Sequence, residues 1–571
     1  MASTYERTSS DAIIYKANKP RPFPQLDLLT LLFESPLSGA KEDTVLHADA
    51  EDPSKAITKA QLRPLVKSTA YTLRHEFGIG KNGPNEDIIL CVSTGHWQLP
   101  TIFLSTIAAG GVFTASNPGS TAQELAAQLR QVSAKLLICN ADTKDTAAAA
   151  AKLAGLPFSR VLQLGSGPEL QLSNLSHGAA IPISPDRSLE WERVTDPATL
   201  ENSVICVLFS SGTTGTPKVC RLSHTNIVSE ATLVVDPTRE VYASQNRPWI
   251  YRTLAHLPAA HIAGVQGYLV NPFYVGGTVY WMPRFDWPKF LAYMKQYQIT
   301  NFFSVPPIFL LIAKSPLVTG QFDSVEMAVS GAAPMGHELQ RAARKKLGKG
   351  QAQLTQTWGL SETTGSMTMT VFGAPDDPTG SVASLISNCT ARIVDDNGKD
   401  VEPGQPGEIW VKGPQVTKGY YKNDAANREA FVDGWFCTGD IAIFKDGKLY
   451  IVDRKKELIK YKGTQVAPAE LEALLISHPK ILDAAVIGVH AQEDTEVPRA
   501  YVVADPTQTS ADEIIDWVAS QVSNHKRLRG GVIFLPVIPK TPSGKILRKN
   551  LRELAEKEDA AKKGGPGSSK L

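Results

Sequence analysis

A run of six apolar residues at positions 204–209 (VICVLF) feeds directly into a loop of glycine and hydroxyl residues. The run has the length and composition of a buried strand. Further strands are expected at 87–93 (DIILCVS) and 135–139 (KLLIC), and residues 121–132 between them have helical spacing. Strands that alternate with helices favour a mostly parallel sheet. The sequence therefore predicts an α/β fold, in which ligands usually bind beyond the carboxyl ends of the strands.

The pattern changes after residue 390. The segments ARIVDDNG, GEIWVKG and GKLYIVDR are expected to be short strands of a β-rich subdomain. A small α+β unit follows, with a helix at 466–476, strands at 484–489 and 500–503, and a helix to Val522 that Ser510 and Glu513 cap. We expect the boundary near Asp453 to Lys456, where a strand runs into the charged segment DRKKE. The prediction is a large N-terminal domain at 1–454, made of βα subdomains plus the β-rich subdomain, and a small C-terminal α+β domain at 455–571.

Size, charge and cysteine content exclude several classes of protein. A chain of 571 residues exceeds one simple core. Lys and Arg number 59 against 57 for Asp and Glu, so the charge offers no case for nucleic acid. The six cysteines form no CxxC pair, which argues against zinc and redox sites and indicates reduced core thiols.

Neither the N-terminus nor the most apolar stretch of the sequence indicates secretion or a membrane span. The N-terminus lacks the apolar region of a signal peptide. The most membrane-like stretch, 99–115, is interrupted by Pro100, Gly110 and Gly111, so we expect a buried helix there.

At the C-terminus, Ser569, Lys570 and Leu571 follow a polar, glycine-rich tail and match a peroxisomal address. The expected location is the peroxisome, with its import receptor as a partner.

The loop after the apolar run reads SSGTTGTPK at 210–218. Its glycines allow close backbone approach, its hydroxyls and N–H groups can surround anionic oxygens, and Lys218 adds a positive charge. It does not match the GxxxxGK[ST] phosphate loop. On composition alone, a phosphate cradle and a flexible surface turn are equally well supported. The candidate ligands of the cradle are Ser210, Ser211, Gly212, Thr213, Thr214, Gly215 and Lys218.

Six further motifs follow in order along the chain. They are LPAAHIAG (257–264), SGAAP (330–334), QTWGLSETTG (356–365), GWFCTGD (434–440), DRKKELIKYKGTQVAPAELE (453–472) and PKTPSGKILRK (539–549). With the loop, they resemble the adenylate-forming superfamily of acyl-CoA synthetases, 4-coumarate:CoA ligases and firefly luciferases. The resemblance covers about residues 50–550 and is nearest a peroxisomal 4-coumarate-ligase-like branch.

The resemblance implies ATP, Mg²⁺ and CoA as ligands, and it assigns residues to the nucleotide. The loop would hold the β- and γ-phosphates, and Glu362 would hold Mg²⁺. Ser361 takes the place of a Thr that touches the α-phosphate, and Trp358 replaces an adenine-stacking Tyr. Asp440 would bind the ribose hydroxyls with help from Arg454.

The same resemblance assigns the acyl pocket and the movements of the C-terminal domain. Gly331, Ala332 and Ala333 would line adenine and the acyl group, and Thr357 stands where a Gly is frequent, which narrows the pocket. His261 would lie beside the acyl carboxylate. The mobile C-terminal domain would first present Lys545 to the carboxylate and α-phosphate. In a second pose it would present Lys460, Lys462, Gly463 and Gln465 for the thioester step, with Lys456 as the hinge.

The expected function is that of an ATP-dependent acyl-CoA ligase, an acid–thiol ligase. It would activate an aromatic or fatty acid as acyl-AMP, release pyrophosphate and pass the acyl group to CoA. A luciferase-like oxygenase that acts on its adenylate, and an inactive nucleotide-binding scaffold, remain alternatives. A carrier-protein adenylation domain is less favoured.

Overall fold

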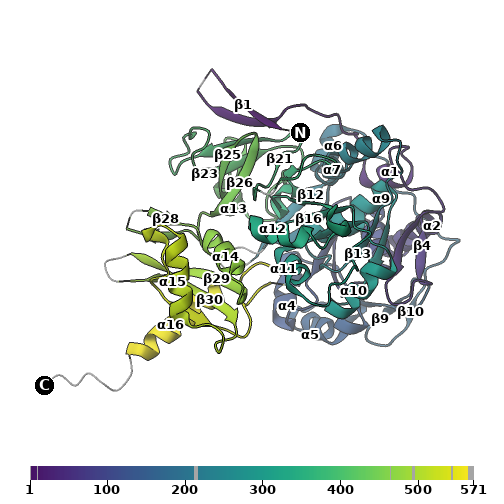
Figure 1. Cartoon of the computed structure of the whole chain (residues 1–571). Helices are drawn as coiled ribbons and strands as arrows, with labels where there is room; N and C mark the ends of the chain where they lie inside the picture. Colours follow the sequence, from purple (N-terminus) through teal and green to yellow (C-terminus); the bar gives the residue numbers. More distant parts are fainter. Residues whose placement is uncertain are drawn as a thin grey trace.

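The computed structural model describes residues 2–9, 11–210, 217–377, 379–462, 464–491, 495–541 and 544–563, the last four without their side chains. A large N-terminal body lies beside a smaller C-terminal unit, drawn in yellow-green in Figure 1. The predicted α/β fold with a large first domain and a small second domain is confirmed. In the described residues, the helices are too short or too polar to cross a membrane. Ser211, Gly212, Thr213, Thr214, Gly215, Gly463, Ser569, Lys570 and Leu571 lie outside the described residues.

An eight-stranded sheet forms the first half of the body, in the order β10-β9-β8-β7-β5-β6-β11-β12. Its centre is parallel and consists of β5 (Ile88–Val92), β6 (Val112–Ser116), β7 (Leu136–Asn140), β8 (Val161–Leu164) and β11 (Val204–Ser210). Its edges are antiparallel and consist of β9 (Leu172–Asn174), β10 (Ala180–Ile181) and β12 (Lys218–Ser223). The predicted strands and their parallel pairing are confirmed.

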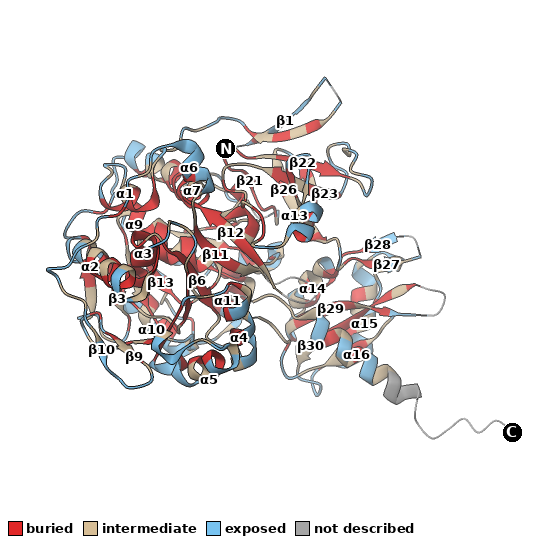
Figure 2. Ribbon diagram, turned by 180° about the vertical axis from the view of Figure 1, so that it is seen from behind, coloured by how far each residue is buried: buried red, intermediate tan, exposed pale blue. Residues whose placement is uncertain are grey.

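Helices cover both faces of this sheet, because the side chains of its central strands alternate between two cores. Ile88 and Leu90 pack with residues of α4 (Ala122–Gln131) and α5 (Lys144–Ala154). Ile89 and Cys91 pack on the opposite side with α2 (Lys59–Phe77), α3 (Leu99–Ala108) and α7 (His224–Ser244). Figure 2 shows these central elements buried and the outer helix surfaces exposed.

The expectation of one buried helix over 99–115 is wrong in its second part. Residues 99–108 form α3, all of them buried, but β6 begins at Val112. Between them, Gly110 has a left-handed φ of 72°, which ends the helix. A side chain on Gly111 would meet Ile79 at 2.6 Å, so the turn also needs a glycine for close packing.

Two further sheets carry loops that line the candidate functional site. The first, β13-β14-β3-β4, consists of β3 (Val45–Asp49), β4 (Ala56–Thr58), β13 (Arg252–Ala255) and β14 (Thr278–Trp281). The second is parallel and consists of β15 (Asn301–Ser304), β16 (Met327–Ser330) and β17 (Gln353–Gln356). Their helices are α8 (Ile262–Gly264), the π-helical η3 (Val265–Val270), α9 (Asn271–Val275), α10 (Trp287–Gln296), α11 (Pro306–Lys314) and α12 (His337–Arg344).

The predicted β-rich subdomain is a seven-stranded sheet. It consists of β1 (Ser3–Arg7), β2 (Ile13–Ala17), β22 (Thr390–Val394), β23 (Gly407–Lys412), β24 (Phe431–Val432), β25 (Trp435–Lys445) and β26 (Lys448–Arg454). The first two strands come from the N-terminus, 370 residues earlier, and the sequence did not indicate them. Short elements complete the body: α1 (Leu28–Phe33), α6 (Pro197–Asn202), α13 (Asp424–Ala430), β18 (Gly359–Leu360), β19 (Gly365–Ser366), β20 (Thr368–Met369), β21 (Ser384–Leu385), and 3₁₀ turns at Ala141–Thr143, Phe158–Arg160, Gly348–Gly350 and Ser361–Thr363.

The C-terminal unit has its own core. Its elements are β27 (Ile459–Tyr461), β28 (Thr464–Val466), α14 (Pro468–Ser477), β29 (Ile481–His490), β30 (Glu496–Ala504), α15 (Ala511–Gln521), the 3₁₀ turn Asn524–Lys526, β31 (Val532–Phe534) and α16 (Arg548–Lys563). The predicted capping box is present, because Ser510 Oγ accepts from Glu513 N and Glu513 Oε2 accepts from Ser510 N. The last strand of the seven-stranded sheet ends at Arg454, and the boundary between 454 and 455 stays a prediction.

Candidate functional site

Two adjoining cavities lie where the body meets the C-terminal unit. One, of about 240 Å³, is lined mainly by apolar and aromatic side chains from α7, α8, β15 and β16, and we call it the apolar cavity. The other, of about 550 Å³, is lined by charged and polar groups, and we call it the polar cavity. His261, Leu360, Ser361 and Lys545 border both. These four residues therefore stand where the two cavities meet.

The two described ends of the glycine- and hydroxyl-rich segment are Ser210 and Lys218. Ser210 and Lys218 are paired across β11 and β12, and the Ser210 hydroxyl donates to Lys218 O at 3.3 Å. Both residues line the polar cavity. The Lys218 ammonium lies 4.9 Å from the centre of the Tyr420 ring and 4.0 Å from the Glu429 carboxylate. The loop thus joins two antiparallel strands, unlike a P-loop, which joins a strand to a helix.

Glu362 is buried in the wall of the polar cavity with 8% of its surface exposed. The Tyr420 hydroxyl donates to Glu362 Oε1 at 3.0 Å, which orients the carboxylate. Burial and the Glu362 charge raise the Tyr420 pKa, so this tyrosine remains a donor. No group of three or more His, Cys, Asp or Glu side chains suited to a metal occurs among the described residues. A single carboxylate fits Mg²⁺ that arrives with the phosphates of a nucleotide, because Mg²⁺ takes few protein ligands.

Asp440 is held by two donors from different elements. The indole N–H of Trp358 donates to its Oδ2 at 2.8 Å, and Arg454 pairs with its Oδ1 at 2.8 Å. Asp440 is 4% exposed and Trp358 is 7% exposed, so the contact between them is shielded from water, whereas Arg454 is partly exposed. Trp358 packs in the core of the seven-stranded sheet. The predicted ribose ligand is therefore fixed in place, and the tryptophan acts on it directly.

The loops after β16 and β17 form one wall of the apolar cavity. Gly331 and Ala332 line it, with Ala333 in the same turn. A Cβ on Gly331 would lie 3.2 Å from both Phe303 and the Thr357 methyl, so only glycine fits there easily. The Thr357 hydroxyl donates to Thr368 O at 2.7 Å. Thr357 thus contributes its methyl group to this crowded wall.

His261 lies immediately before α8 at the junction of the cavities. Burial and the nearby Lys545 charge lower its pKa to about 4, so the imidazole is neutral at pH 7. Its Nε2 is buried and has no hydrogen-bond partner among the described residues. A neutral imidazole with an unused nitrogen suits a contact with a ligand carboxylate or phosphate oxygen.

Lys545 enters the junction from the C-terminal unit on a tight loop. Thr541 N donates to Lys545 O at 2.8 Å, and Lys545 N donates to the Thr541 hydroxyl at 3.1 Å. Gly544 has a φ of 80°, and a Cβ there would meet Val305 at 3.1 Å, so the loop packs closely against the start of α11. Burial, and then the positive charge of Arg454, lower the pKa of Lys545. The negative charges of Asp440 and Glu362 act in the opposite direction. The lysine therefore faces both the polar groups and the apolar cavity.

Comparisons with known proteins identify this arrangement. The sequence model of the family described as AMP-binding enzyme matches residues 33–421, and that of the AMP-binding enzyme C-terminal domain matches 470–545. The chain belongs to the adenylate-forming superfamily of AMP-binding enzymes.

Individual relatives agree over almost the whole chain. A protein of Emericella nidulans that bears the name acyl-coenzyme A synthetase is 46% identical over 548 residues, which cover 95% of this chain and 98% of that protein. The 4-coumarate:CoA ligase 1 of Petunia hybrida is 36% identical, and the match covers 83% of this chain and 86% of that protein. The crystal structure of ATP-bound MatB from Rhodopseudomonas palustris has a TM-score of 0.77 at 26% identity and covers 92% of this chain and 98% of that chain.

In this adenylate-forming enzyme, the residues expected for the thioester step lie apart from Lys545. Lys460 and Gln465 are paired across β27 and β28, and with Lys462 they are exposed. Glu496 Oε2 accepts from Lys460 N at 2.9 Å. Lys456, the expected hinge, is exposed at the rim of the polar cavity. The structure corresponds to the pose in which Lys545 occupies the site.

Two groups of this adenylate-forming site escaped the sequence analysis. Tyr420 orients Glu362 from 58 residues away. Glu230 is a carboxylate 2% exposed on α7 that lines the apolar cavity. An acidic residue inside an otherwise apolar helical stretch was the available signal for Glu230.

Proposed function

We propose that this chain is an ATP-dependent acyl-CoA ligase that forms acyl-AMP and then an acyl-CoA thioester. The observation that carries this is the position of Lys545 and His261 at the junction of a polar cavity and an apolar cavity. The names of the relatives support the prediction of an AMP-forming acyl-CoA ligase. Their full-length coverage extends this support to both domains.

In the first half-reaction, a carboxylate oxygen of the acid attacks the α-phosphorus of ATP. The bond between that phosphorus and the bridging oxygen breaks, and pyrophosphate leaves with the electron pair. Two anions must meet in this step, so a cation at the junction of the cavities stabilises the transition state. Lys545 supplies that charge, and His261 presents its neutral ring beside the acid. Mg²⁺, held by Glu362, would neutralise charge on the phosphates.

In the second half-reaction, the CoA sulfur attacks the acyl carbon, the thiol loses its proton and AMP leaves. This step forms no new bond to phosphorus, so we assign Lys545 no role in it. We propose that the C-terminal domain turns about Lys456 and brings the β27–β28 hairpin to the site. The exposed positions of Lys460 and Gln465 are compatible with such a rotation of the domain.

The volume of the apolar cavity bounds the acid. A cavity of about 150 Å³ accommodates benzene, whereas this one measures about 240 Å³. By that ratio it holds roughly ten non-hydrogen atoms. We propose an aromatic acid with a short side chain or a medium-chain fatty acid.

The test is ATP–pyrophosphate exchange with a panel of aromatic and medium-chain acids, followed by AMP release with and without CoA. The expected result is acid-dependent exchange, with AMP release that requires CoA. Exchange without CoA-dependent AMP release would replace the ligase by another adenylate chemistry, and no exchange with any acid would refute an enzymatic role.

We also propose that Ser569, Lys570 and Leu571 direct the protein to peroxisomes. Support for this comes from the sequence alone. A fluorescent protein fused to the N-terminus is expected to colocalise with a peroxisomal marker and to lose that location when Leu571 is replaced by Ser. A diffuse signal from the unchanged chain would contradict the proposal.

A further inference from the structure

Three polar side chains from neighbouring elements stand in the wall of the apolar cavity. They are Glu230 of α7, Gln266 of η3 and Asn271 of α9, and we call them the polar end. Asn271 Nδ2 lies 3.5 Å from Glu230 Oε2, a long hydrogen bond. Gln266 Nε2 lies 3.5 Å from Ile227 O. Residue 365 is a glycine with a φ of 119°. A Cβ at this position would lie 3.0 Å from Glu230 Oε1. The glycine therefore leaves space beside the carboxyl group.

The amide NH₂ groups of Gln266 and Asn271 are engaged, but their amide oxygens are not. Gln266 Oε1 and Asn271 Oδ1 are both buried and have no hydrogen-bond partner within the described ranges. Such orphaned buried oxygens cost free energy unless something donates to them. A ligand that brings a hydrogen-bond donor into the cavity would satisfy both oxygens.

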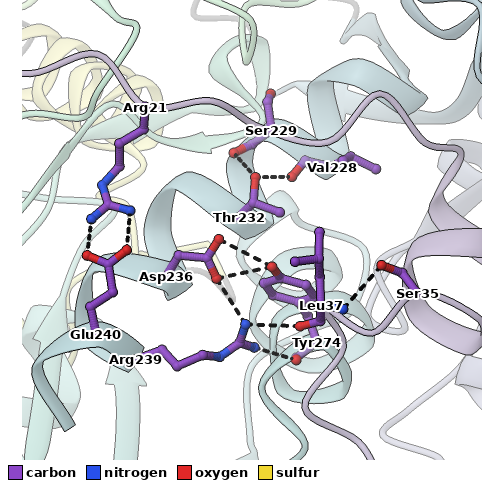
Figure 3. Close-up of polar contacts among 10 residues, drawn as sticks. All are labelled: Arg21, Ser35, Leu37, Val228, Ser229, Thr232, Asp236, Arg239, Glu240 and Tyr274. Carbon is purple, nitrogen blue, oxygen red and sulfur yellow. Dashed lines mark hydrogen bonds and ion pairs between the residues drawn. The ribbon is translucent and has the colours of Figure 1, made fainter. Parts of the chain in front are cut away.

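Neighbouring polar groups on α7 are satisfied without a ligand, as Figure 3 shows. The Thr232 hydroxyl donates to Val228 O at 3.0 Å and the Ser229 hydroxyl donates to Asn226 O at 3.1 Å. One turn beyond Thr232, Tyr274 of α9 donates to Asp236 at 3.1 Å, and Arg239 pairs with Asp236 at 3.0 Å. The Tyr274–Asp236 bond and a 2.7 Å bond from Arg239 to Tyr274 O connect α7 to α9, and so restrain the separation of Glu230 and Asn271.

Glu230 itself faces no opposite charge. The groups that act on it within the described chain are the Ser366 N–H and the Asn271 side chain, and neither carries a charge. Burial raises its pKa to about 8, so the carboxyl group is mostly protonated at pH 7. It then combines one O–H donor with an accepting oxygen.

The polar end lies away from the reacting end of the cavity. His261 immediately precedes a continuous helical segment, α8–η3–α9, on which Gln266 and Asn271 follow five and ten residues later. At 1.5 Å per residue, these positions are at most about 8 and 15 Å along the axis from His261. Tyr251, Phe303, Val235 and Met369 are among the apolar residues of the same cavity. An acid with its carboxylate at His261 and Lys545 would extend over this apolar wall toward the polar end.

We propose that Glu230, Gln266 and Asn271 select an acid that carries a hydrogen-bond donor, a hydroxyl or an amino group, at the end opposite its carboxylate. This inference rests on the proposed ligase function and specifies its substrate class. The donor satisfies the unpaired amide oxygens, and Glu230 donates to or accepts from the same group. An acid without the donor leaves these groups unpaired, which a site built for a hydroxyl rejects strongly.

The experiment compares acids of one skeleton that differ only at the far end. The probes are 3-phenylpropanoate and its 4-hydroxy, 4-amino and 4-methoxy derivatives, with octanoate and 8-hydroxyoctanoate as an aliphatic pair. The readout is kcat/KM for each acid in ATP–pyrophosphate exchange. The wild-type protein is expected to prefer a donor-bearing acid over its matched non-donor at least tenfold in one of the two series.

Variants then assign the preference to the polar end. Glu230→Leu should reduce the donor preference to one or below, and Asn271→Leu should reduce it at least threefold. Thr232→Val, on the same helix but bonded within it, should keep the wild-type ratio. Glu230→Gln keeps the shape and should retain part of the preference, which separates recognition from a packing defect.

The outcomes distinguish this inference from the ligase function. Equal kcat/KM for all acids in the wild-type protein would overturn the inference alone and would indicate that bound water satisfies the polar end. A donor preference that survives in Glu230→Leu and Asn271→Leu would also overturn it. No exchange with any acid would overturn the ligase function, and the inference with it.

Discussion

The indole N–H of Trp358 donates a hydrogen bond of 2.8 Å to Oδ2 of Asp440, across 82 residues of sequence. The resemblance placed an adenine-stacking residue at 358 and a ribose ligand at 440 as separate contacts. The structure couples them, since Asp440 is buried and its second oxygen is paired with Arg454. Trp358 therefore helps to set the orientation of the carboxylate that we expect to bind the ribose.

Trp358→Phe removes this donor and keeps an aromatic ring. A hydrogen bond to a charged group contributes about 1.5–3 kcal/mol, so the KM for ATP should rise at least tenfold, with a smaller change in kcat. Steady-state kinetics with varied ATP checks this. Trp191→Phe is a matched control, because the Trp191 indole N–H is buried and has no hydrogen-bond partner among the described residues. An unchanged KM in Trp358→Phe would show that Arg454 alone orients Asp440.

Tyr420→Phe removes the 3.0 Å bond to Glu362 and leaves the ring that faces Lys218. The carboxylate then becomes less fixed, and the expected result is a several-fold higher Mg²⁺ concentration for half-maximal exchange. Titration of Mg²⁺ at saturating ATP measures it. Tyr421→Phe, next along the chain, is expected to show the wild-type Mg²⁺ dependence. The same dependence in Tyr420→Phe would mean that Glu362 needs no support from this hydroxyl.

Glu230 should make stability depend on pH. Its ordinary pKa is 4.5 and the folded value is about 8, so the native state binds the proton more tightly than the unfolded state. Stability from this group is complete below about pH 4.5 and is lost as pH rises toward 8. The total loss is on the order of 5 kcal/mol. Glu230→Gln should therefore gain stability relative to wild type between pH 5 and 8, measured by urea unfolding at each pH. A constant difference across this range would place the Glu230 pKa near its ordinary value.

Lys456→Pro should separate the half-reactions. Proline fixes φ and restricts the residue before it, so a hinge at 456 could no longer turn. We expect near-normal acid-dependent exchange but at least a hundredfold slower thioester formation, measured from isolated acyl-AMP and CoA. Lys456→Ala should keep both steps. Equal loss of both steps in the proline variant would indicate a folding defect, and the loss of neither would place the hinge elsewhere.

Local patterns predicted those parts of the fold that depend on neighbouring residues. The strand at 204–209 and the capping box at Ser510 are set by adjacent side chains, and both are present. The break in 99–115 was missed because Gly111 is required by tertiary packing, since a Cβ there would meet Ile79 at 2.6 Å. The motifs indicated Lys545 and Asp440, but the family pattern carries no information about the pairing of Trp358. Glu230 was missed because only the fold brings Gly365 and Asn271 against α7.

The central claim is that Lys545 catalyses adenylate formation from the junction of the two cavities. The most direct measurement compares the two half-reactions in Lys545→Ala. Removal of one preorganised charge from a transition state costs roughly 10²–10³-fold in rate. We predict that acid-dependent ATP–pyrophosphate exchange falls by at least that factor, while conversion of supplied acyl-AMP and CoA to thioester stays within about twofold of wild type. Exchange at the wild-type rate in Lys545→Ala would contradict the account.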